Sequence, residues 1–365
     1  MRIWWAAALV LGSVPQVGWG QFAGSTDESG HTRLSPVAKT VSLGEVRHSI
    51  ETVADVSEMK YQNGYFVGLT GTGGVEVLDK DGRTIASFKP RPEIKDFAGE
   101  FVNLEPMDVA ATADGSIVVS VVFELSDRGR RYFYLLKYDK GGNYVDETDL
   151  GAWRAVKICA AEDGSIWTLS GEERLGLAVY SPSEGVLRNY KASAGLQKAV
   201  APRSQFAEDS RNSFTFNSAI DCSKDVHALT GDGQWLEYTA DGTLTILPLD
   251  DAAPDRADGL PKLRGFAYLE TGHVYGLLDD GSRDAILRRF VELLPSADGL
   301  TLHWSAIALP HPKSEVSAAL GESTPSPAQT VTYLLGADHS DGEQIVYRTS
   351  AGSAIVWAQP VLQVR

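Results

Sequence analysis

Short stretches of alternating apolar and polar residues fill most of the chain, separated by turns rich in Gly, Asp and Asn. A clear example runs from Cys159 to Tyr190, CAAEDGSIWTLSGEERLGLAVYSPSEGVLRNY, with four such stretches and three turns. Alternation of this kind around Asp-Gly predicts pairs of antiparallel strands. Helical periodicity is nearly absent, so the sequence predicts an all-β fold.

The second hairpin of this segment recurs along the chain. Each copy has an apolar strand ending in an anchor residue, followed by a polar turn with glycine and another strand. The anchors follow one another at intervals of 42 to 60 residues: Leu78, Tyr138, Tyr180, Tyr238, Phe290 and Tyr347. A further hairpin precedes most anchors, most clearly VAATADGSIVVSV and CAAEDGSIWTLSG. Each unit is therefore two hairpins in series, or one four-stranded blade.

A period of roughly 40 to 55 residues with four strands per copy is typical of a β-propeller. We predict six four-stranded blades, with seven as the alternative, in a single domain over residues 46–365. Residues 21–45 are predicted to be a flexible lead-in. Within it, AKTVSL (38–43), near Lys39, is a candidate for the outer strand of the last blade, which would close the ring.

The units AEDGSIWTLSG and LAVYSPSEG resemble those of streptogramin-lyase and two-component-regulator propellers. The whole pattern resembles the six-bladed propellers of the NHL, SMP-30/gluconolactonase and TolB-like type. This resemblance implies a ligand site on the face that holds the loops between strands two and three. The lyases imply a channel histidine paired with an acid, and the lactonases imply a metal held by Glu, Asn and Asp. Asp108 and Asn217 match two of these parts, and Glu58 falls near the strand expected for the glutamate.

The repeat places four polar residues at the starts of inner strands: Asp108, Lys157, Asn217 and Arg264. One interpretation is a ring of solvated side chains around a central channel. The other is a ligand funnel in which Arg264 and Lys157 hold an anion or carbonyl while Asp108 acts as acid, base or metal ligand.

The segment GADHSDGEQ is aligned with the loops between strands two and three, and it contains Asp338, Asp341 and Glu343. Oxygen-rich clusters suit calcium, so these residues are candidate metal ligands. The segment DKDG from Asp79 resembles a calcium loop, but its place in a hairpin predicts a turn. His227 takes the second-strand position held by Trp167 in another repeat and is expected to be a packed side chain.

Cys159 and Cys222 are the two cysteines of the chain. The repeat alignment places them two or three residues out of register in neighbouring blades, an axial offset of roughly 7 to 10 Å. A disulfide requires Cα atoms within about 7 Å, so a disulfide is not expected.

Residues 1–20 have the pattern of a signal peptide: Arg2, an apolar run from Ile3 to Leu11, and Gly18-Trp19-Gly20. We therefore expect export to the periplasm or the cell exterior, without stable membrane insertion, because the apolar run is too short to span a bilayer. The formal net charge of −15 argues against nucleic acid as a partner. Because propellers close on themselves, a monomer is expected.

Motifs for zinc proteases, α/β-hydrolases, phosphate loops and dinucleotide binding are absent from the sequence. Two functional hypotheses remain. The first is an exported binding module that recognises a peptide, glycan or partner protein through its channel face or rim. The alternative is a propeller enzyme, a metal-assisted lactonase or hydrolase or a lyase, acting on a small polar substrate at the channel mouth.

Overall fold

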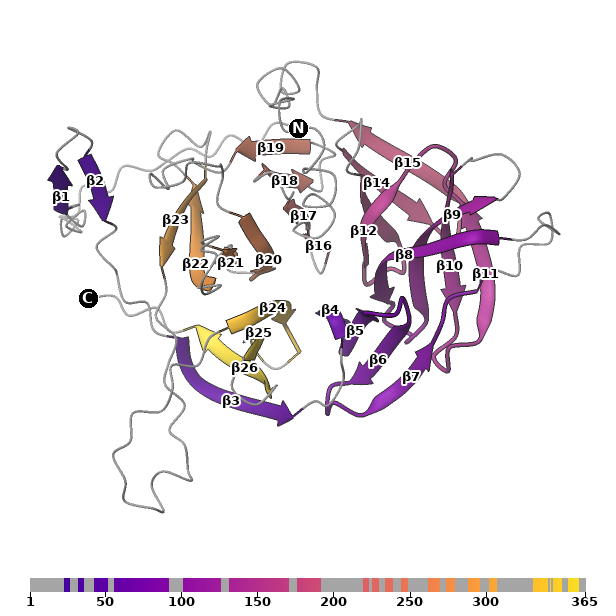
Figure 1. The fold of residues 1–365 in the computed structure, drawn as a ribbon, viewed down its shortest axis with the longest axis horizontal. Coiled ribbons are helices and arrows are strands. Elements are labelled where there is room, and N and C mark those ends of the chain that lie inside the picture. The colour runs from indigo at the N-terminus through magenta and orange to yellow at the C-terminus, as the bar shows by residue number, and fades with distance from the viewer. Residues whose placement is uncertain are drawn as a thin grey trace, which may run out of the picture.

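The computed structural model of the chain consists of β-strands joined by turns and loops (Figure 1). It describes residues 23–26, 32–35, 43–51, 56–91, 101–125, 131–170, 176–191, 219–222, 225–229, 234–238, 244–248, 262–269, 274–279, 288–295, 302–306, 331–340, 342, 344–349 and 354–360. Across these ranges no helix is formed, and so none that could cross a membrane. The all-β prediction is confirmed.

The described strands form six four-stranded antiparallel sheets. The first sheet contains β4 (Val56–Gln62), β5 (Tyr65–Thr70), β6 (Val75–Asp79) and β7 (Thr84–Phe88). The second contains β8 (Phe101–Ala111), β9 (Ile117–Leu125), β10 (Arg131–Tyr138) and β11 (Tyr144–Asp149). The third contains β12 (Ala155–Ala160), β13 (Ile166–Ser170), β14 (Gly176–Ser181) and β15 (Val186–Lys191).

The fourth sheet contains β16 (Ala219–Asp221), β17 (Val226–Leu229), β18 (Gln234–Tyr238) and β19 (Leu244–Pro248). The fifth contains β20 (Lys262–Tyr268), β21 (Val274–Asp279), β22 (Arg288–Pro295) and β23 (Leu302–Ala306). In these five sheets the strands follow chain order, as two hairpins in series would. A separate two-stranded ribbon, β1 (Ala23–Thr26) with β2 (Thr32–Ser35), lies within the segment expected to be a flexible lead-in.

The sixth sheet joins the two ends of the folded chain. It contains β24 (Val331–Asp338), β25 (Gln344–Thr349) and β26 (Ala354–Pro360), and its outer strand is β3 (Leu43–Glu51). In this antiparallel pair Ile50 lies opposite Ile355. The closing strand thus begins at Leu43, where the expected segment 38–43 ends. This pairing covers the outer edge of β26, and β3 becomes the edge strand of the sheet.

This closure corrects the strand assignment of the last repeat. Tyr347 lies in the second strand of its sheet, whereas the anchor Tyr138 lies in a third strand. The repeat predicts the C-terminal hairpin QIVYRTSAGSAIVW to be strands three and four, because its pattern is the same at either position. Only the pairing with β3 shows that it supplies strands two and three.

The sheets are arranged in a ring, with the first strand of each sheet nearest to the centre (Figure 1). Contacts between these inner strands run from β8 to β12, β16, β20, β24 and β4. Lys60 of β4 then bonds to Asp108 of β8 and completes the circle. A ring of four-stranded antiparallel sheets is a β-propeller, so the predicted β-propeller architecture is confirmed.

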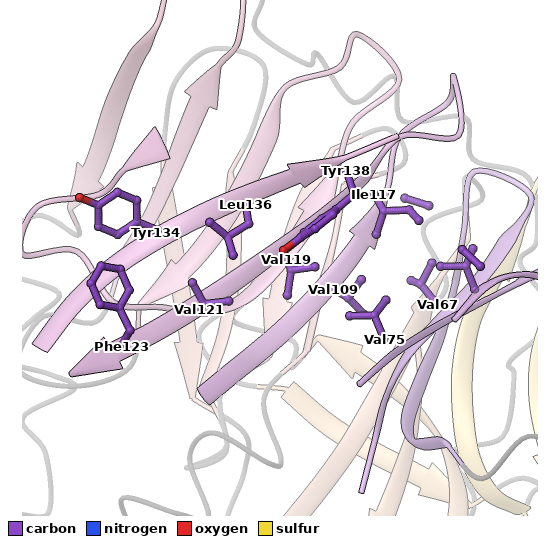
Figure 2. Close-up of a cluster of buried hydrophobic side chains, with 13 residues drawn as sticks. Val67, Val75, Val109, Ile117, Val119, Val121, Phe123, Tyr134, Leu136 and Tyr138 are labelled. Carbon is purple, nitrogen blue, oxygen red and sulfur yellow. The ribbon is translucent and has the colours of Figure 1, made fainter. Parts of the chain in front are cut away.

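The core lies between neighbouring sheets, because each sheet is apolar on both faces. In β9, Val119, Val121 and Phe123 pack toward the first sheet, as Figure 2 shows. Val118, the residue before Val119, packs toward the third sheet, with Ile158. This period of two is what a strand buried on both faces requires. Burial of each large aliphatic side chain stabilises the fold by roughly 1.5–3 kcal/mol.

Side-chain oxygens at the hairpin turns hold the backbone. Oδ1 of Asp79 accepts hydrogen bonds from the backbone N–H groups of Asp81 and Arg83, at 2.9 and 2.8 Å. Gly82 follows with a φ of 76°, a conformation that glycine adopts without steric cost. The interpretation of DKDG as a turn is confirmed.

Candidate functional site

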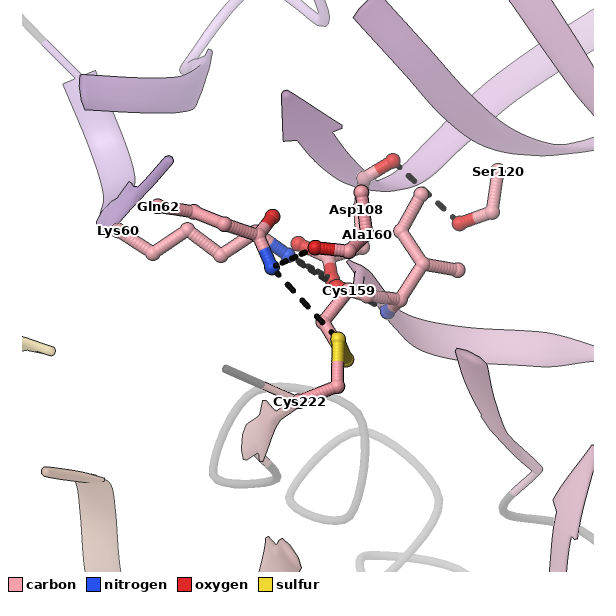
Figure 3. A network of polar contacts seen from close by, with 8 residues as sticks. Lys60, Gln62, Asp108, Ser120, Cys159, Ala160 and Cys222 are labelled. Atoms are coloured by element: carbon pink, nitrogen blue, oxygen red, sulfur yellow. Dashed lines mark hydrogen bonds and ion pairs between the residues drawn. A yellow bond between two sulfur atoms is a disulfide. The ribbon is translucent and has the colours of Figure 1, made fainter. Parts of the chain in front are cut away.

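Asp108 is the inner-strand carboxylate that the sequence singles out, and it is buried, with 6% of its surface exposed. Its Oδ2 accepts a hydrogen bond from Nζ of Lys60 at 2.7 Å and another from the backbone N–H of Ile158 at 2.7 Å (Figure 3). Lys60 also donates to the carbonyl of Ile158. One carboxylate in the second sheet therefore connects the inner strands of the first three sheets.

The end of β4 extends this network toward the third and fourth sheets. Nδ2 of Asn63 donates to the carbonyls of Ala111 at 2.8 Å and Ala160 at 3.0 Å. Nε2 of Gln62 lies 3.4 Å from the carbonyl oxygen of Ala160 and 3.9 Å from Sγ of Cys222. The turn between β4 and β5 thus contacts three other sheets. Polar groups at this end of the ring are engaged in holding it together.

Asn63 can make these contacts because of its backbone conformation. Its φ is 52°, and Gly64 follows with a φ of 82°. Two successive positive φ values are those of a type I′ hairpin turn, for which Asn-Gly is the favoured pair. The turn therefore fixes the backbone of Asn63 while its amide group reaches the neighbouring sheets.

Cys159 and Cys222 form a disulfide, with Cα atoms 6.1 Å apart. The expectation of free thiols was wrong because the alignment placed the residues too far apart along the axis. Cys159 pairs with Trp167, and Asp221 pairs with His227, which occupies the equivalent second-strand position. Cys222 therefore lies one residue beyond the position equivalent to Cys159, roughly 3.3 Å along a strand.

The other channel candidates are only partly described. Lys157 lies in β12 and is buried, with 6% of its surface exposed. Arg264 lies in β20 within the register shift between Leu263 and Phe266. Asn217 lies outside the described residues. A ligand-binding role for Asp108, Lys157, Asn217 and Arg264 stays a prediction.

Asp338 is held by the seam between the sixth and first sheets. Its Oδ2 accepts hydrogen bonds from the Tyr61 hydroxyl at 2.8 Å and from Nε1 of Trp357 at 3.2 Å. Its Oδ1 accepts from the backbone N–H and the hydroxyl of Ser340, at 3.0 and 2.7 Å. Burial alone would raise the pKa of Asp338, but the hydrogen bonds from Ser340, Tyr61 and Trp357 outweigh it and lower the pKa.

The loop that follows Asp338 lies at the other end of the sheets from the one expected. It joins β24 to β25, strands one and two of the sixth sheet, and not strands two and three. Asp341 and Glu343 lie outside the described residues, and among described side chains no group of three His, Cys, Asp or Glu could hold a metal.

Lys60, Tyr61, Gln62 and Asn63 are the polar residues that sequence reasoning missed. They alternate along β4: Lys60 and Gln62 reach the second and third sheets, and Tyr61 packs with the sixth. The Asn-Gly turn at 63–64 marks the hairpin. The long-range partners leave no local signal, because the bond from Gln62 to Ala160 spans 98 positions.

No protein-family model matches the chain, and no curated protein matches it. Among solved structures, it is similar to YCF48 bound to D1 peptide, with a TM-score of 0.41 and 7% identity, over 89% of this chain and 100% of that chain. The chain is similar to the Dos1 propeller with a TM-score of 0.40 and 11% identity, over 92% of this chain and 81% of that chain. It is similar to BBS1N in complex with ARL6DN with a TM-score of 0.41 and 11% identity, over 84% of this chain and 80% of that chain. TM-scores this low carry no argument about function.

Proposed function

We propose that this protein is an exported six-bladed propeller of the NHL, SMP-30 or TolB-like type that binds a protein or peptide partner. The observation that carries the proposal is the use of the inner-strand polar groups. Lys60, Asn63 and Asp108 bond to neighbouring sheets and so stabilise the ring itself. A ring held in this way is a rigid scaffold, and binding residues are concentrated on the loops that such scaffolds position.

Two features support export. Residues 1–20 have the pattern of a signal peptide. The disulfide between Cys159 and Cys222 is the second, because disulfides form and persist in oxidising compartments.

The loops between strands two and three are the surface that we assign to the partner. The opposite end of the ring is occupied near its centre by the β4–β5 turn, through Gln62 and Asn63. The formal net charge of −15 favours a partner with a basic surface, since complementary charge speeds encounter and excludes acidic competitors.

Paired charge-neutralising variants test this assignment. Glu105 and Glu124 lie toward the end that holds the strand-two to strand-three loops, and Asp81 and Glu162 lie in exposed turns at the other end. Each pair of substitutions, Glu105→Gln with Glu124→Gln or Asp81→Asn with Glu162→Gln, removes the same charge. Binding to a library of lysine-rich peptides would be measured by fluorescence anisotropy on the mature chain.

The first pair is expected to weaken binding at least fivefold, and the second pair to leave it unchanged. Equal losses would indicate non-specific attraction, and absence of binding to any basic peptide would contradict the proposed partner. Thermal unfolding with chelator and then with calcium addresses the enzyme alternative, because a ligand specific for the folded state raises its stability. A rise in Tm that chelator reverses would favour the metal-assisted enzyme.

A further inference from the structure

The seam between the fourth and fifth sheets contains a buried histidine. His227 lies in β17 and is 1% exposed. Its ring stacks on Tyr268 of β20, with centroids 3.8 Å apart, and on Trp235 of β18 at 5.3 Å. Trp235 in turn makes an edge contact with Phe266 of β20. The imidazole is therefore part of the aromatic packing that joins the two sheets.

One ring nitrogen of this histidine is unsatisfied. Nδ1 of His227 is buried and has no hydrogen-bond partner among the described residues. Burial lowers the pKa of His227 from 6.5 to about 4, and a backbone hydrogen bond at Asp225 opposes this shift. At neutral pH the ring is uncharged, which suits a stack of aromatic side chains.

Acidic groups surround the ring on its own sheet. Asp221 of β16 and Glu237 of β18 lie directly opposite His227 in the strand register, so all three share one face. Asp225 precedes β17, and Tyr268 is the titratable group that faces His227 from β20. Burial raises the pKa of Glu237, with a hydrogen bond from Trp235 opposing it. Desolvation is the larger effect on the pKa of His227, and the backbone hydrogen bond at Asp225 offsets only part of it.

The fourth sheet is linked to both of its neighbours by side-chain contacts. The disulfide from Cys222 to Cys159 fastens it to the third sheet. Toward the fifth sheet it makes the aromatic contacts of His227 and Trp235.

We propose that the seam between the fourth and fifth sheets is an acid-sensitive joint, which opens when His227 gains a proton. A protonated imidazole would place a positive charge between the two sheets, where the neutral side chain now stacks on aromatic rings. Because the disulfide is indifferent to mild acid, the seam with the third sheet stays fastened. The ring of sheets is therefore expected to open at the seam between the fourth and fifth sheets.

The direction of the pH effect follows from which state of the protein, closed or open, binds the proton on His227 more tightly. The pKa of His227 is lower in the closed state than in an opened or unfolded chain, so the open state takes up the proton. The stabilisation of the closed state by neutral His227 is complete above about pH 6.5 and is lost as the pH falls toward 4. With these two values, the equilibrium constant for opening rises roughly thirtyfold between pH 7.5 and pH 5. Glu237 acts in the opposite sense, because a raised pKa in the closed state stabilises it as the pH falls.

Hydrogen exchange on the full mature chain tests the joint directly. Peptides covering β17 and β20 would be compared with peptides covering β9 and β13 at pH 7.5 and pH 5, after correction for intrinsic exchange rates. In the native protein, opening at β17 and β20 is expected to rise roughly thirtyfold at pH 5, whereas β9 and β13 change little. In His227→Phe, which retains an aromatic ring but has no titratable group, this response should disappear.

The proposal is wrong if protection of β17 and β20 does not depend on pH, or if His227→Phe keeps the dependence. Should His227→Phe fail to fold, His227→Gln and an NMR titration of the His227 ring provide independent measurements. A ring midpoint above pH 6 in the folded protein would overturn the proposal. Glu237→Gln should retain or enlarge the response, because Glu237 acts in the opposite sense, and loss of the response in this variant would contradict the proposal.

Discussion

Nζ of Lys60 lies 2.7 Å from Oδ2 of Asp108, across the joint between the first and second sheets. The same oxygen accepts the backbone N–H of Ile158 from the third sheet. The side chains of Lys60 and Asp108 are 21% and 8% exposed. An acid that the sequence presents as a candidate for catalysis is thus a bridge between three inner strands.

Asp108→Ala should destabilise the protein strongly. Removal of the carboxylate leaves the Lys60 ammonium and the Ile158 N–H without this partner in a largely buried place. Breaking a buried ion pair costs on the order of 3 kcal/mol, because the remaining charge is uncompensated. Urea unfolding measures the loss, and the double variant Lys60→Met with Asp108→Ala should recover part of it.

The exposed ion pair of Glu184 and Arg188 provides the control, with side chains 48% and 58% exposed. Glu184→Ala should cost less than about 1 kcal/mol, because solvent screens such pairs. If Asp108→Ala instead folds as stably as the native protein and loses partner binding, Asp108 belongs to a ligand site.

Removing the disulfide should also destabilise the chain. Cys159 and Cys222 are 63 positions apart. In the loop-entropy model, a cross-link of that span raises the free energy of the unfolded chain by about 4 kcal/mol, because it removes conformational entropy. The variant Cys159→Ala with Cys222→Ala should therefore unfold at a lower urea concentration. Reductant should shift the native protein toward this variant, whereas the variant itself should not respond. Alkylation of both thiols in the native protein without reductant would show that the disulfide does not form.

The sequence was sufficient for the hairpins because their signals are local. In the turn at Asp114-Gly115, the Asp114 carboxylate accepts a hydrogen bond from the backbone N–H of Ser116, and Gly115 has a φ of 83°. Both features are local to the hairpin. The alternation of Val118 and Val119 then predicts that both faces of β9 are buried. From these signals the repeat and the propeller follow.

The contacts between sheets were not predictable in this way. Pairing of Ile50 with Ile355, or the bond from Asn63 to Ala160, joins residues far apart in the chain. Their geometry depends on how the ring closes, which no short pattern records. The same dependence explains the misplaced loop after Asp338, since one strand from the N-terminal segment changes the strand count of the last sheet.

Tyr61→Phe should weaken the seam between the first and sixth sheets. The Tyr61 hydroxyl donates to the ionised Asp338, and a hydrogen bond to a charged group contributes about 1.5–3 kcal/mol. Tyr65→Phe is the matched control, because the Tyr65 hydroxyl makes a long contact of 3.4 Å with Lys140. Thermal unfolding at pH 7 should lower the Tm for Tyr61→Phe and leave it nearly unchanged for Tyr65→Phe. Equal shifts in Tm would show that the hydrogen bond from Tyr61 to Asp338 does not stabilise this seam.

The same seam should lose stability in stronger acid than the His227 seam. The pKa of Asp338 is lower in the folded protein than its ordinary value of 3.8, so the folded state resists protonation. Its contribution is complete well above pH 3.8 and is lost as the pH falls through the lowered value. Asp338→Asn should therefore flatten the acid limb of the urea midpoint below pH 4. An unchanged acid limb in Asp338→Asn would mean that other carboxylates produce it.

Gly142 in the β10–β11 turn and Gly164 in the β12–β13 turn share one hydrogen-bond pattern and a φ of 83°, but only Gly142 closely faces a neighbouring sheet. A Cβ on Gly142 would lie 2.6 Å from Cδ1 of Phe88, whereas one on Gly164 would meet nothing within 4 Å. Both alanine variants incur roughly 1–2 kcal/mol for the left-handed backbone. Gly142→Ala should lose about 1–3 kcal/mol more, because Phe88 packs against Tyr138 and must shift. Urea unfolding of the two variants measures this difference, and equal losses would show that the first and second sheets are not in contact at this turn.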